Sequence, residues 1–356
     1  MAKFLQLSDL HLDSKIAELD AQKRAVRRQE LKDSFCRAIE LAKTEAVDFI
    51  LICGDLFDSE YAEPGTLALL ARELACNLPV FLSPGNHDPY TAAAVRDSQL
   101  PDNVHVFGGA IEAVELPDIH VRVYGRGFLD SEEPHPLLAG FRAADDAMAN
   151  VMALHGEVTT GESSYNPVRP DDIANSGLDY LALGHVHTFS QLQKAGNTYY
   201  AYSGTHEGHG FDECGEKGVI LGEVEKGRVS IKFVPTCIRQ YQRIGVDITG
   251  CTLIEDVASR VRDAAATPEF LYQIELCGTR DTSLNLQMDL LQSMLSVDAF
   301  FLKLRDASKP GYLLEQIAKE PTLKGVFARH VLKEMEQNPQ NAGLLQEAAG
   351  LVLDLF

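Results

Sequence analysis

Residues 49–58 have the sequence Phe-Ile-Leu-Ile-Cys-Gly-Asp-Leu-Phe-Asp. A short apolar run that ends at a glycine indicates a buried β-strand, here Phe49–Cys53. Gly54 permits a tight turn, and Asp55 then brings a carboxylate to the end of the strand. A Gly-Asp pair alone is an ordinary turn, so its meaning depends on what the rest of the chain places beside it.

Four other loops bring polar side chains to the end of a predicted strand. The residues that follow these strands are Asp9 and His11, then Asn86, His87 and Asp88, then His155, and finally His185 and His187. Each motif alone has a simpler explanation as a surface loop, a helix N-cap or a buried core histidine. All of them in order, each after a strand, predict one functional site built on loops that a rigid sheet holds in place.

The side-chain types in these loops predict two divalent metal ions. A mixture of carboxylate, imidazole and amide groups without thiolate suits Mn²⁺, Fe²⁺, Co²⁺ or Zn²⁺, with Mn²⁺ favoured, and disfavours a structural zinc site. Two neighbouring cations need a shared negative ligand, and Asp55 is the natural bridge. Such a pair, about 3.5–4 Å apart, activates a water molecule and holds a phosphate group.

Charge and cysteine content limit the function classes. The formal net charge of −20 argues against nonspecific electrostatic binding of nucleic acid over the whole surface. An anionic substrate therefore needs a local positive site. Seven scattered cysteines, none in a C-x-x-C pair, argue against a disulfide framework and fit a reducing cytoplasm. We find no apolar leader and no apolar run of about 18 residues, so we expect a cytoplasmic protein without membrane contact.

The spacing of strands and helices predicts three regions. Residues 1–234 form the catalytic region, residues 235–308 a small α/β region, and residues 309–356 a helical tail. Strands are expected at Lys3–Leu7, Phe49–Cys53, Val80–Leu82, His120–Tyr124, Val151–Leu154, Tyr180–Leu183, Tyr199–Tyr202, Val219–Val224, Val229–Val234 and Phe270–Leu276. Helices are expected at Gln29–Thr44, Thr66–Cys76, Ile254–Ala265, Asn285–Leu295, Leu313–Lys319, Leu323–Met335 and Leu344–Leu355.

The five loops together resemble the calcineurin-like metallophosphoesterases over about residues 3–205. The resemblance implies an α+β fold with a two-sheet β-sandwich flanked by helices. It also implies that one metal ion is held by Asp9, His11, Asp55 and His187, and the second by Asp55, Asn86, His155 and His185. His87 matches the catalytic histidine of the family, and Asp88 is expected to orient it.

Within that family the chain looks most like the SbcD-type bacterial DNA repair exonucleases. The resemblance rests on the opening Ser8–Ser14, on Tyr202-Ser203-Gly204 leading to Phe211–Gly215, and on Lys217-Gly218-Val219. It implies a nuclease for single- or double-stranded DNA ends in double-strand break repair. It further implies a DNA-facing role for residues 235–308 and a coiled-coil ATPase partner, SMC-like or Rad50-like, bound by the C-terminal helices. Asp58 stands where some nuclease relatives have a DNA-gripping histidine, so that role does not transfer.

Alternatives remain at several points. A phosphatase or phosphodiesterase for small molecules or phosphoproteins would share every motif, although it would not need the region after Pro235. An inactive scaffold on the same fold is disfavoured because every ligand type is retained. Lys23, Arg24, Arg27, Arg28 and Lys32 form a basic cluster, in which Arg24, Arg28 and Lys32 share one helix face. This face is either solvated or a DNA contact, and His206 and His209 either pack or reach the site. The apolar stripes of the tail pack on the catalytic region, form a homodimer or bind the partner.

Overall fold

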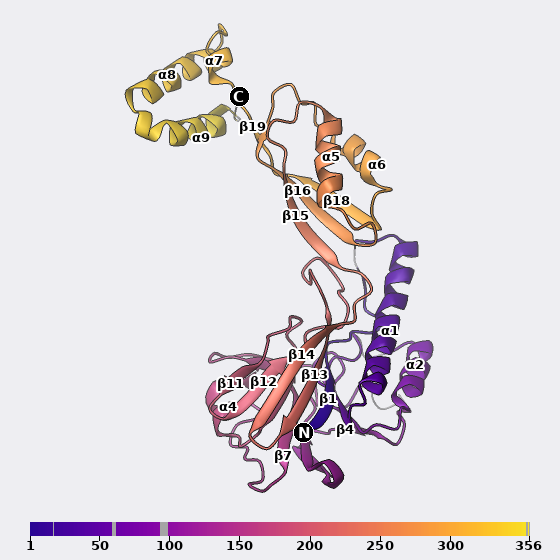
Figure 1. Cartoon of the computed structure of the whole chain (residues 1–356). Helices are drawn as coiled ribbons and strands as arrows, with labels where there is room; N and C mark the ends of the chain where they lie inside the picture. The colour runs from indigo at the N-terminus through magenta and orange to yellow at the C-terminus, as the bar shows by residue number, and fades with distance from the viewer. Residues whose placement is uncertain (17, 59–61, 93–98, 354, 356) are drawn as a thin grey trace. The chain divides into compact units, whose positions relative to one another are not determined.

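The computed structural model describes residues 1–16, 18–58, 62–92, 99–353 and 355. The chain divides into two compact units, Met1–Gln240 and Tyr241–Phe356 (Figure 1). The predicted loops all fall in the first unit.

The first sheet of this unit has the strand order β14-β13-β1-β2-β3-β4. Neighbouring strands are parallel from β1 to β4, whereas β13 and β14 add an antiparallel hairpin beside β1. The strands are β1 (Ala2–Leu7), β2 (Phe49–Ile52), β3 (Val80–Leu82), β4 (Val104–Val106), β13 (Gly218–Glu225) and β14 (Arg228–Pro235). Because parallel strands end at the same edge, the loops after β1, β2 and β3 start side by side.

The second sheet has the order β11-β12-β10-β7-β6-β5. Its inner strands β6, β7, β10 and β12 are parallel, and β5 and β11 are antiparallel edges. The strands are β5 (Glu112–Leu116), β6 (Val121–Gly125), β7 (Ala149–His155), β10 (Tyr180–Gly184), β11 (Gln193–Ala195) and β12 (Thr198–Tyr202). The sequence analysis missed β4, β5 and β11, which are short and only partly buried.

One apolar core joins the two sheets. Phe4, Phe49 and Leu51 of the first sheet and Val151 and Tyr180 of the second belong to the same buried cluster. Every second strand residue points into this layer, as the two-residue period of a strand requires. The predicted two-sheet α+β fold is therefore confirmed.

Helices cover the outer faces of the sandwich. Helices α1 (Ala21–Thr44) and α2 (Pro64–Leu74) lie together beside the first sheet, and α4 (Pro170–Asn175) packs on the second (Figure 1). Helix α1 starts eight residues before the predicted Gln29. Asp20 caps its N-terminus, because the Asp20 side chain accepts a hydrogen bond of 2.9 Å from the backbone N–H of Lys23.

The second unit contains a parallel sheet of three strands with the order β15-β16-β18. The elements are β15 (Tyr241–Asp247), α5 (Ile254–Ala264), β16 (Leu271–Cys277), α6 (Met288–Leu295) and β18 (Phe301–Asp306). Helices α5 and α6 share a buried cluster with the sheet. Strands β15 and β18 were not predicted from the sequence, because exposed polar and charged residues shorten their apolar runs.

The C-terminal helices have a small core of their own. Helices α7 (Leu314–Ile317), α8 (Leu323–Gln337) and α9 (Ala342–Leu353) share a buried cluster that includes Ala328, Val331 and Ala349. The predicted helix Leu344–Leu355 contains residue 354, which lies outside the described residues. The remaining short elements are β8 (Glu157–Val158), β9 (Pro167–Val168), β17 (Thr279–Arg280), β19 (Lys309–Pro310), η1 (Pro117–Ile119) and η2 (Pro339–Asn341). Among the described residues, no helix is long and apolar enough to cross a membrane.

Candidate metal centre

The predicted loops converge at the carboxyl ends of strands from both sheets. Asp9 follows β1, Asp55 follows β2 and Asn86 follows β3, whereas His155 ends β7 and His185 follows β10. The Asp9 carboxylate accepts a hydrogen bond from the backbone N–H of His185 at 2.9 Å, so loops of the two sheets meet directly. The site thus lies where the ends of the two sheets come together.

Four of the predicted ligand residues have a left-handed backbone. The φ angles are 52° at Asp9, 42° at His11, 52° at Asp55 and 101° at His185. This region is unfavourable for residues other than glycine and needs support from the surrounding structure. Two backbone hydrogen bonds of 3.0 Å supply part of that support. They run from Asp9 N–H to the Gly54 carbonyl oxygen and from His11 N–H to the Asp55 carbonyl oxygen.

Gly54 is required by close packing at this edge. Its φ is +86°, and a Cβ atom there would collide with the imidazole of His155. A side chain at this position would therefore push the β7 loop away from the β2 loop. The glycine lets the two sheets approach closely enough for their polar side chains to share one site.

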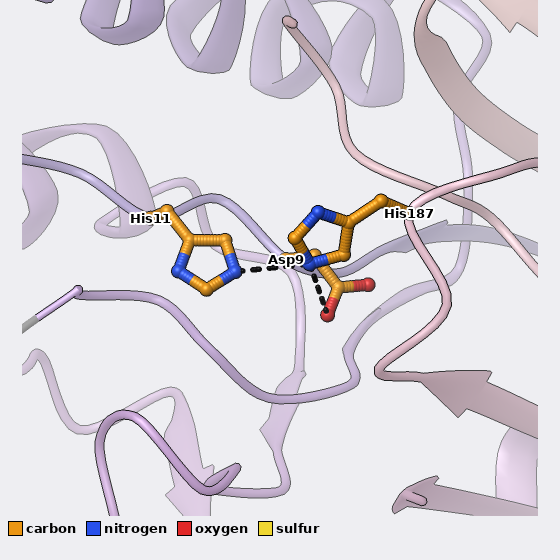
Figure 2. Close-up of side chains that lie close together, drawn as sticks. All are labelled: Asp9, His11 and His187. Atoms are coloured by element: carbon orange, nitrogen blue, oxygen red, sulfur yellow. Dashed lines mark hydrogen bonds and ion pairs between the residues drawn. The ribbon is translucent and has the colours of Figure 1, made fainter. Parts of the chain in front are cut away.

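Asp9, His11 and His187 form the first donor group (Figure 2). The Nε2 atom of His11 lies 3.2 Å from Nε2 of His187, and Nε2 of His187 lies 3.8 Å from a carboxylate oxygen of Asp9. The three side chains point toward a common centre, although His187 comes from a different loop from Asp9 and His11.

Asp55 links this group to a second one, formed by Asp9, Asp55 and His155. Its Oδ2 atom lies 3.3 Å from His155 Nε2 and 3.7 Å from His11 Nε2. The almost fully buried Asp55 carboxylate therefore faces imidazoles on both sides, which is the geometry that a bridging ligand needs.

Hydrogen bonds at Nδ1 leave the Nε2 atoms of these histidines available for a metal. His155 Nδ1 lies 2.9 Å from the carbonyl oxygen of Cys53, which only accepts, so this nitrogen carries the proton. His11 Nδ1 lies 3.2 Å from the Asp58 carboxylate, and His187 Nδ1 contacts the Glu213 carboxylate. In neutral rings the lone pairs of His11 and His187 then face each other, an arrangement that a cation between them stabilises. The donor set fits a divalent metal.

Asn86 and His185 lie on the β7 side of the centre. Asn86 Oδ1 is 2.9 Å from His155 Nε2. The His185 ring packs edge-on against His155, with centroids 5.2 Å apart, and also against Tyr165 at 5.1 Å. The structure therefore brings all seven predicted ligands to one place, with His185 at its margin.

The buried carboxylates favour positive charge at the centre. Burial lowers the pKa of His155, but the adjacent Asp55 outweighs burial and raises the pKa to about 9. The pKa of His185 is lowered, first by burial and then by the neighbouring His155. The hydrogen bond to Glu213 likewise outweighs burial at His187 and raises its pKa to about 9, so carboxylates favour positive charge on both sides of the centre.

His87 is partnered by a different carboxylate from the one expected. Its ring is 44% exposed, and its Nδ1 lies 3.1 Å from Oδ1 of Asp58. Asp88, which was expected to orient His87, is fully buried and accepts hydrogen bonds from the backbone N–H groups of Asp55, Leu56 and Gly85 at 3.1, 2.6 and 2.9 Å. Asp88 therefore ties the β2 loop to the β3 loop, and Asp58 holds His87. The signal for Asp58 was present in the sequence, at the end of Gly54–Asp58.

A family model described as calcineurin-like phosphoesterase matches residues 2–189. The chain belongs to this family. It is therefore a metal-dependent phosphoesterase, and the family together with the donor groups supports two divalent metal ions.

Two relatives match a larger share of the chain than the family model does. The chain is 29% identical over 284 residues to an uncharacterized metallophosphoesterase, YhaO, of Bacillus subtilis (strain 168), covering 73% of this chain and 68% of that protein. It is 27% identical over 266 residues to the DNA double-strand break repair protein Mre11 of Sulfurisphaera tokodaii, covering 69% of this chain and 63% of that protein. The chain thus spans about two thirds of the length of these relatives. A solved dimetal phosphatase from Danio rerio aligns with 66% of this chain and 96% of its own, with 12% identity and a TM-score of 0.44.

The sequence did not decide whether His206 and His209 reach the site, and the structure gives them different surroundings. His206 is fully buried, and its Nε2 lies 2.9 Å from the carbonyl oxygen of Leu31 in α1. His209 packs edge-on against His11, with ring centroids 5.5 Å apart, and its Nδ1 lies 2.9 Å from a carboxylate oxygen of Glu213. His206 is a packing residue, whereas His209 supports the site. The sequence analysis gave Glu213 no role, because a contact between residues 187 and 213 has no local signal.

The basic cluster on α1 is divided in the structure. The Lys32 ammonium pairs with Asp13 at 3.1 Å and lies 3.9 Å from Glu63, so its charge is offset locally. Arg27 is fully buried between Glu30 and Glu207. Arg24 is exposed, and Arg28 is partly exposed.

Proposed function

We propose that this phosphoesterase is a DNA nuclease that uses two Mn²⁺ ions and acts on single- or double-stranded ends. The observation that carries phosphodiester hydrolysis is the shared Asp55 carboxylate, which faces His155 at 3.3 Å and His11 at 3.7 Å. DNA as the substrate is supported by the sequence similarity to SbcD-type exonucleases and by a relative named as a DNA double-strand break repair protein. This function would place the protein in the cytoplasm, together with its DNA substrate.

The residues of the chain have distinct tasks in such a reaction. Bound cations would lower the pKa of a shared water molecule and hold the phosphate. Asp9, His11, Asp55 and His187 would hold one ion, and Asp55, Asn86, His155 and His185 the other. His87 Nδ1 donates to Asp58 at 3.1 Å, and this hydrogen bond raises the pKa of His87. The ring can therefore hold a second proton on Nε2 and give it to the departing oxygen.

The acidic surface does not prevent an anionic substrate from binding here. Two bound dications would bring four positive charges, and the carboxylates of Asp9 and Asp55 would offset two of them, so the centre would stay positive. A phosphodiester carries a single negative charge, so it matches this site. The local charge therefore opposes the net charge of −20.

The test is a comparison of substrates with purified protein and Mn²⁺. End-labelled single- and double-stranded DNA are incubated beside bis(p-nitrophenyl) phosphate and a phosphopeptide, with the Asp55→Asn variant as the blank. We expect metal-dependent shortening of DNA from its ends. Turnover of the small phosphodiester or the phosphopeptide with intact DNA would instead support the alternative phosphatase or small-molecule phosphodiesterase.

We also propose that the C-terminal helices bind a coiled-coil ATPase of the SMC or Rad50 type. Several apolar side chains remain exposed on α8 and α9 although these helices share a core. They include Leu323 at 67%, Val326 at 55%, Leu344 at 70% and Leu351 at 64% exposure. Burying each would contribute roughly 1.5–3 kcal/mol, which supports a helix-in-groove partner. A homodimer formed by the same surface is the alternative.

A further inference from the structure

The loop from Gly204 to Gly215 brings a carboxylate to the metal centre. Glu213 is buried, and one of its oxygens accepts a hydrogen bond from His187 Nδ1. The other oxygen accepts from His209 Nδ1 at 2.9 Å and from the His209 backbone N–H at 2.7 Å. Three donors thus fix the two oxygens of one side chain.

The contact with Glu213 decides which nitrogen of His187 faces the site. A carboxylate accepts a hydrogen bond, so the proton of a neutral His187 lies on Nδ1. Its Nε2 is then bare and points toward His11 Nε2 at 3.2 Å and Asp9 at 3.8 Å. A rotated ring or the other tautomer would present a hydrogen in place of a lone pair.

We propose that Glu213 is a positioning residue that fixes the tautomer and ring orientation of His187, and that His209 fixes Glu213 in turn. This inference rests on the proposed ligation of a metal ion by His187. Glu213 does not itself enter the donor groups among the described residues. It acts through His187, as an outer carboxylate commonly does behind a metal-binding histidine.

The loop is anchored firmly enough for this task. The Thr205 hydroxyl donates to the carbonyl oxygen of Asp9 at 2.8 Å, and the Lys217 ammonium donates to the carbonyl oxygen of His187 at 3.1 Å. The buried Arg27 donates to the carbonyl oxygen of Gly208 at 2.7 Å. Contacts on both sides of Glu213 therefore hold its carboxylate against the histidine.

The other two histidines of the donor groups are supported differently. His155 uses the carbonyl oxygen of Cys53 at 2.9 Å, and His11 uses Asp58 at 3.2 Å. Both partners lie in the β2 loop. Loss of Glu213 should therefore affect the ion at His187 and leave the ion at His155 nearly unchanged.

The experiment measures Mn²⁺ binding to Glu213→Gln and Glu213→Ala by calorimetric titration, without DNA. Asp212→Asn is the matched control, since Asp212 lies in the same loop and is exposed. We expect one of the two ions to bind 10–100-fold more weakly in Glu213→Ala, with a smaller loss in Glu213→Gln. The second ion, and both ions in Asp212→Asn, should keep their affinity within about twofold.

A second measurement follows the tautomer in the metal-free protein. Burial lowers the pKa of His187, but the hydrogen bond to Glu213 outweighs burial and raises the pKa to about 9, so the spectra are recorded at about pH 10, where the ring is neutral. Long-range ¹H–¹⁵N spectra of the histidine rings should then show His187 protonated at Nδ1 in the wild type and in Asp212→Asn, and a mixture of tautomers in Glu213→Gln. Because the Gln variant keeps the size of the side chain, it decides the question even if the Ala variant does not fold. Two ions bound at wild-type affinity in Glu213→Gln, together with an unchanged His187 tautomer, would overturn the inference. Failure of the proposed nuclease function would appear separately, as intact DNA with both ions bound.

Discussion

Asp55 faces imidazoles from two different loops, so a change in its charge reaches both metal positions. We predict that Asp55→Asn weakens both ions, because the amide removes the negative charge shared between two dications. Metal analysis after dialysis checks this, with the exposed Asp33→Asn as the control for the loss of one carboxylate. Two fully occupied ions in Asp55→Asn would show that the bridge is elsewhere.

His87 differs from the ligands because its ring is 44% exposed and its Nδ1 is held by Asp58. We predict that His87→Gln keeps both metal ions while hydrolysis falls by roughly 10²–10⁴-fold, the usual contribution of a positioned acid or base. Parallel metal analysis and initial rates separate binding from chemistry. Loss of metal together with activity would assign His87 to the ligands.

At the scale of elements, the packing of His206 against α1 has a consequence for acid stability. Burial lowers the pKa of His206 to about 3 in the folded protein, against about 6.5 in an unfolded chain. Between these values the unfolded state binds a proton that the folded state does not, so stability falls as the pH falls from 6.5 toward 3. At pH 5 this one histidine should lower the free energy of unfolding by about 2 kcal/mol relative to neutral pH.

We therefore predict that His206→Gln, which keeps a donor for the Leu31 carbonyl, loses less stability than the wild type between pH 7.5 and pH 5. Denaturant unfolding in excess chelator at both pH values measures the difference. The other titrating groups are common to the two proteins and cancel in the comparison. Equal losses in both proteins would mean that His206 takes up its proton in the folded state.

The exposed face of α1 gives a prediction about DNA. Arg24 is exposed and Arg28 is partly exposed, whereas Lys32 is paired with Asp13 at 3.1 Å. We predict that Arg24→Ala combined with Arg28→Ala weakens DNA binding and flattens its salt dependence, while Lys32→Ala changes the salt slope less. Binding titrations at several salt concentrations test this, and hydrolysis of a small phosphodiester should stay unchanged in all variants. An unchanged slope in the double variant would make this a solvated helix face.

At the scale of the whole molecule, the sequence predicted which loops come together better than it predicted the boundaries of the elements. Donor residues after strands such as β1, β2 and β3 carry a local signal, because parallel strands must end at one edge. Asp58 belongs to the local motif Gly54–Asp58, but its contact with His87 depends on how two loops meet. The contact of Glu213 with His187 has no local pattern at all. Helix α1 was predicted too short because Arg27, which resembles a surface residue in sequence, is buried in an ion pair with Glu30 at 2.6 Å.

The C-terminal helices allow a test of how far the two units act independently. Helices α7, α8 and α9 share their own apolar cluster, and strand β19 pairs with β17 just before them. A deletion of residues 313–356 keeps that strand pair and removes the helices. We predict that it leaves Mn²⁺-dependent hydrolysis of a small phosphodiester nearly intact and abolishes association with the ATPase, because the donor groups lie wholly within Met1–Gln240.

Point variants separate a docking surface from a general loss of structure. Leu344 and Leu351 are 70% and 64% exposed, so Leu344→Asp and Leu351→Asp should spare the tail core and yet prevent an apolar partner from binding. Gln346→Asp adds the same charge to an exposed position of the same helix and is the matched control. Pull-down with the ATPase and sedimentation of the protein alone distinguish the outcomes. If the Leu variants lose self-association but still bind the ATPase, these helices form a homodimer interface and the partner binds elsewhere.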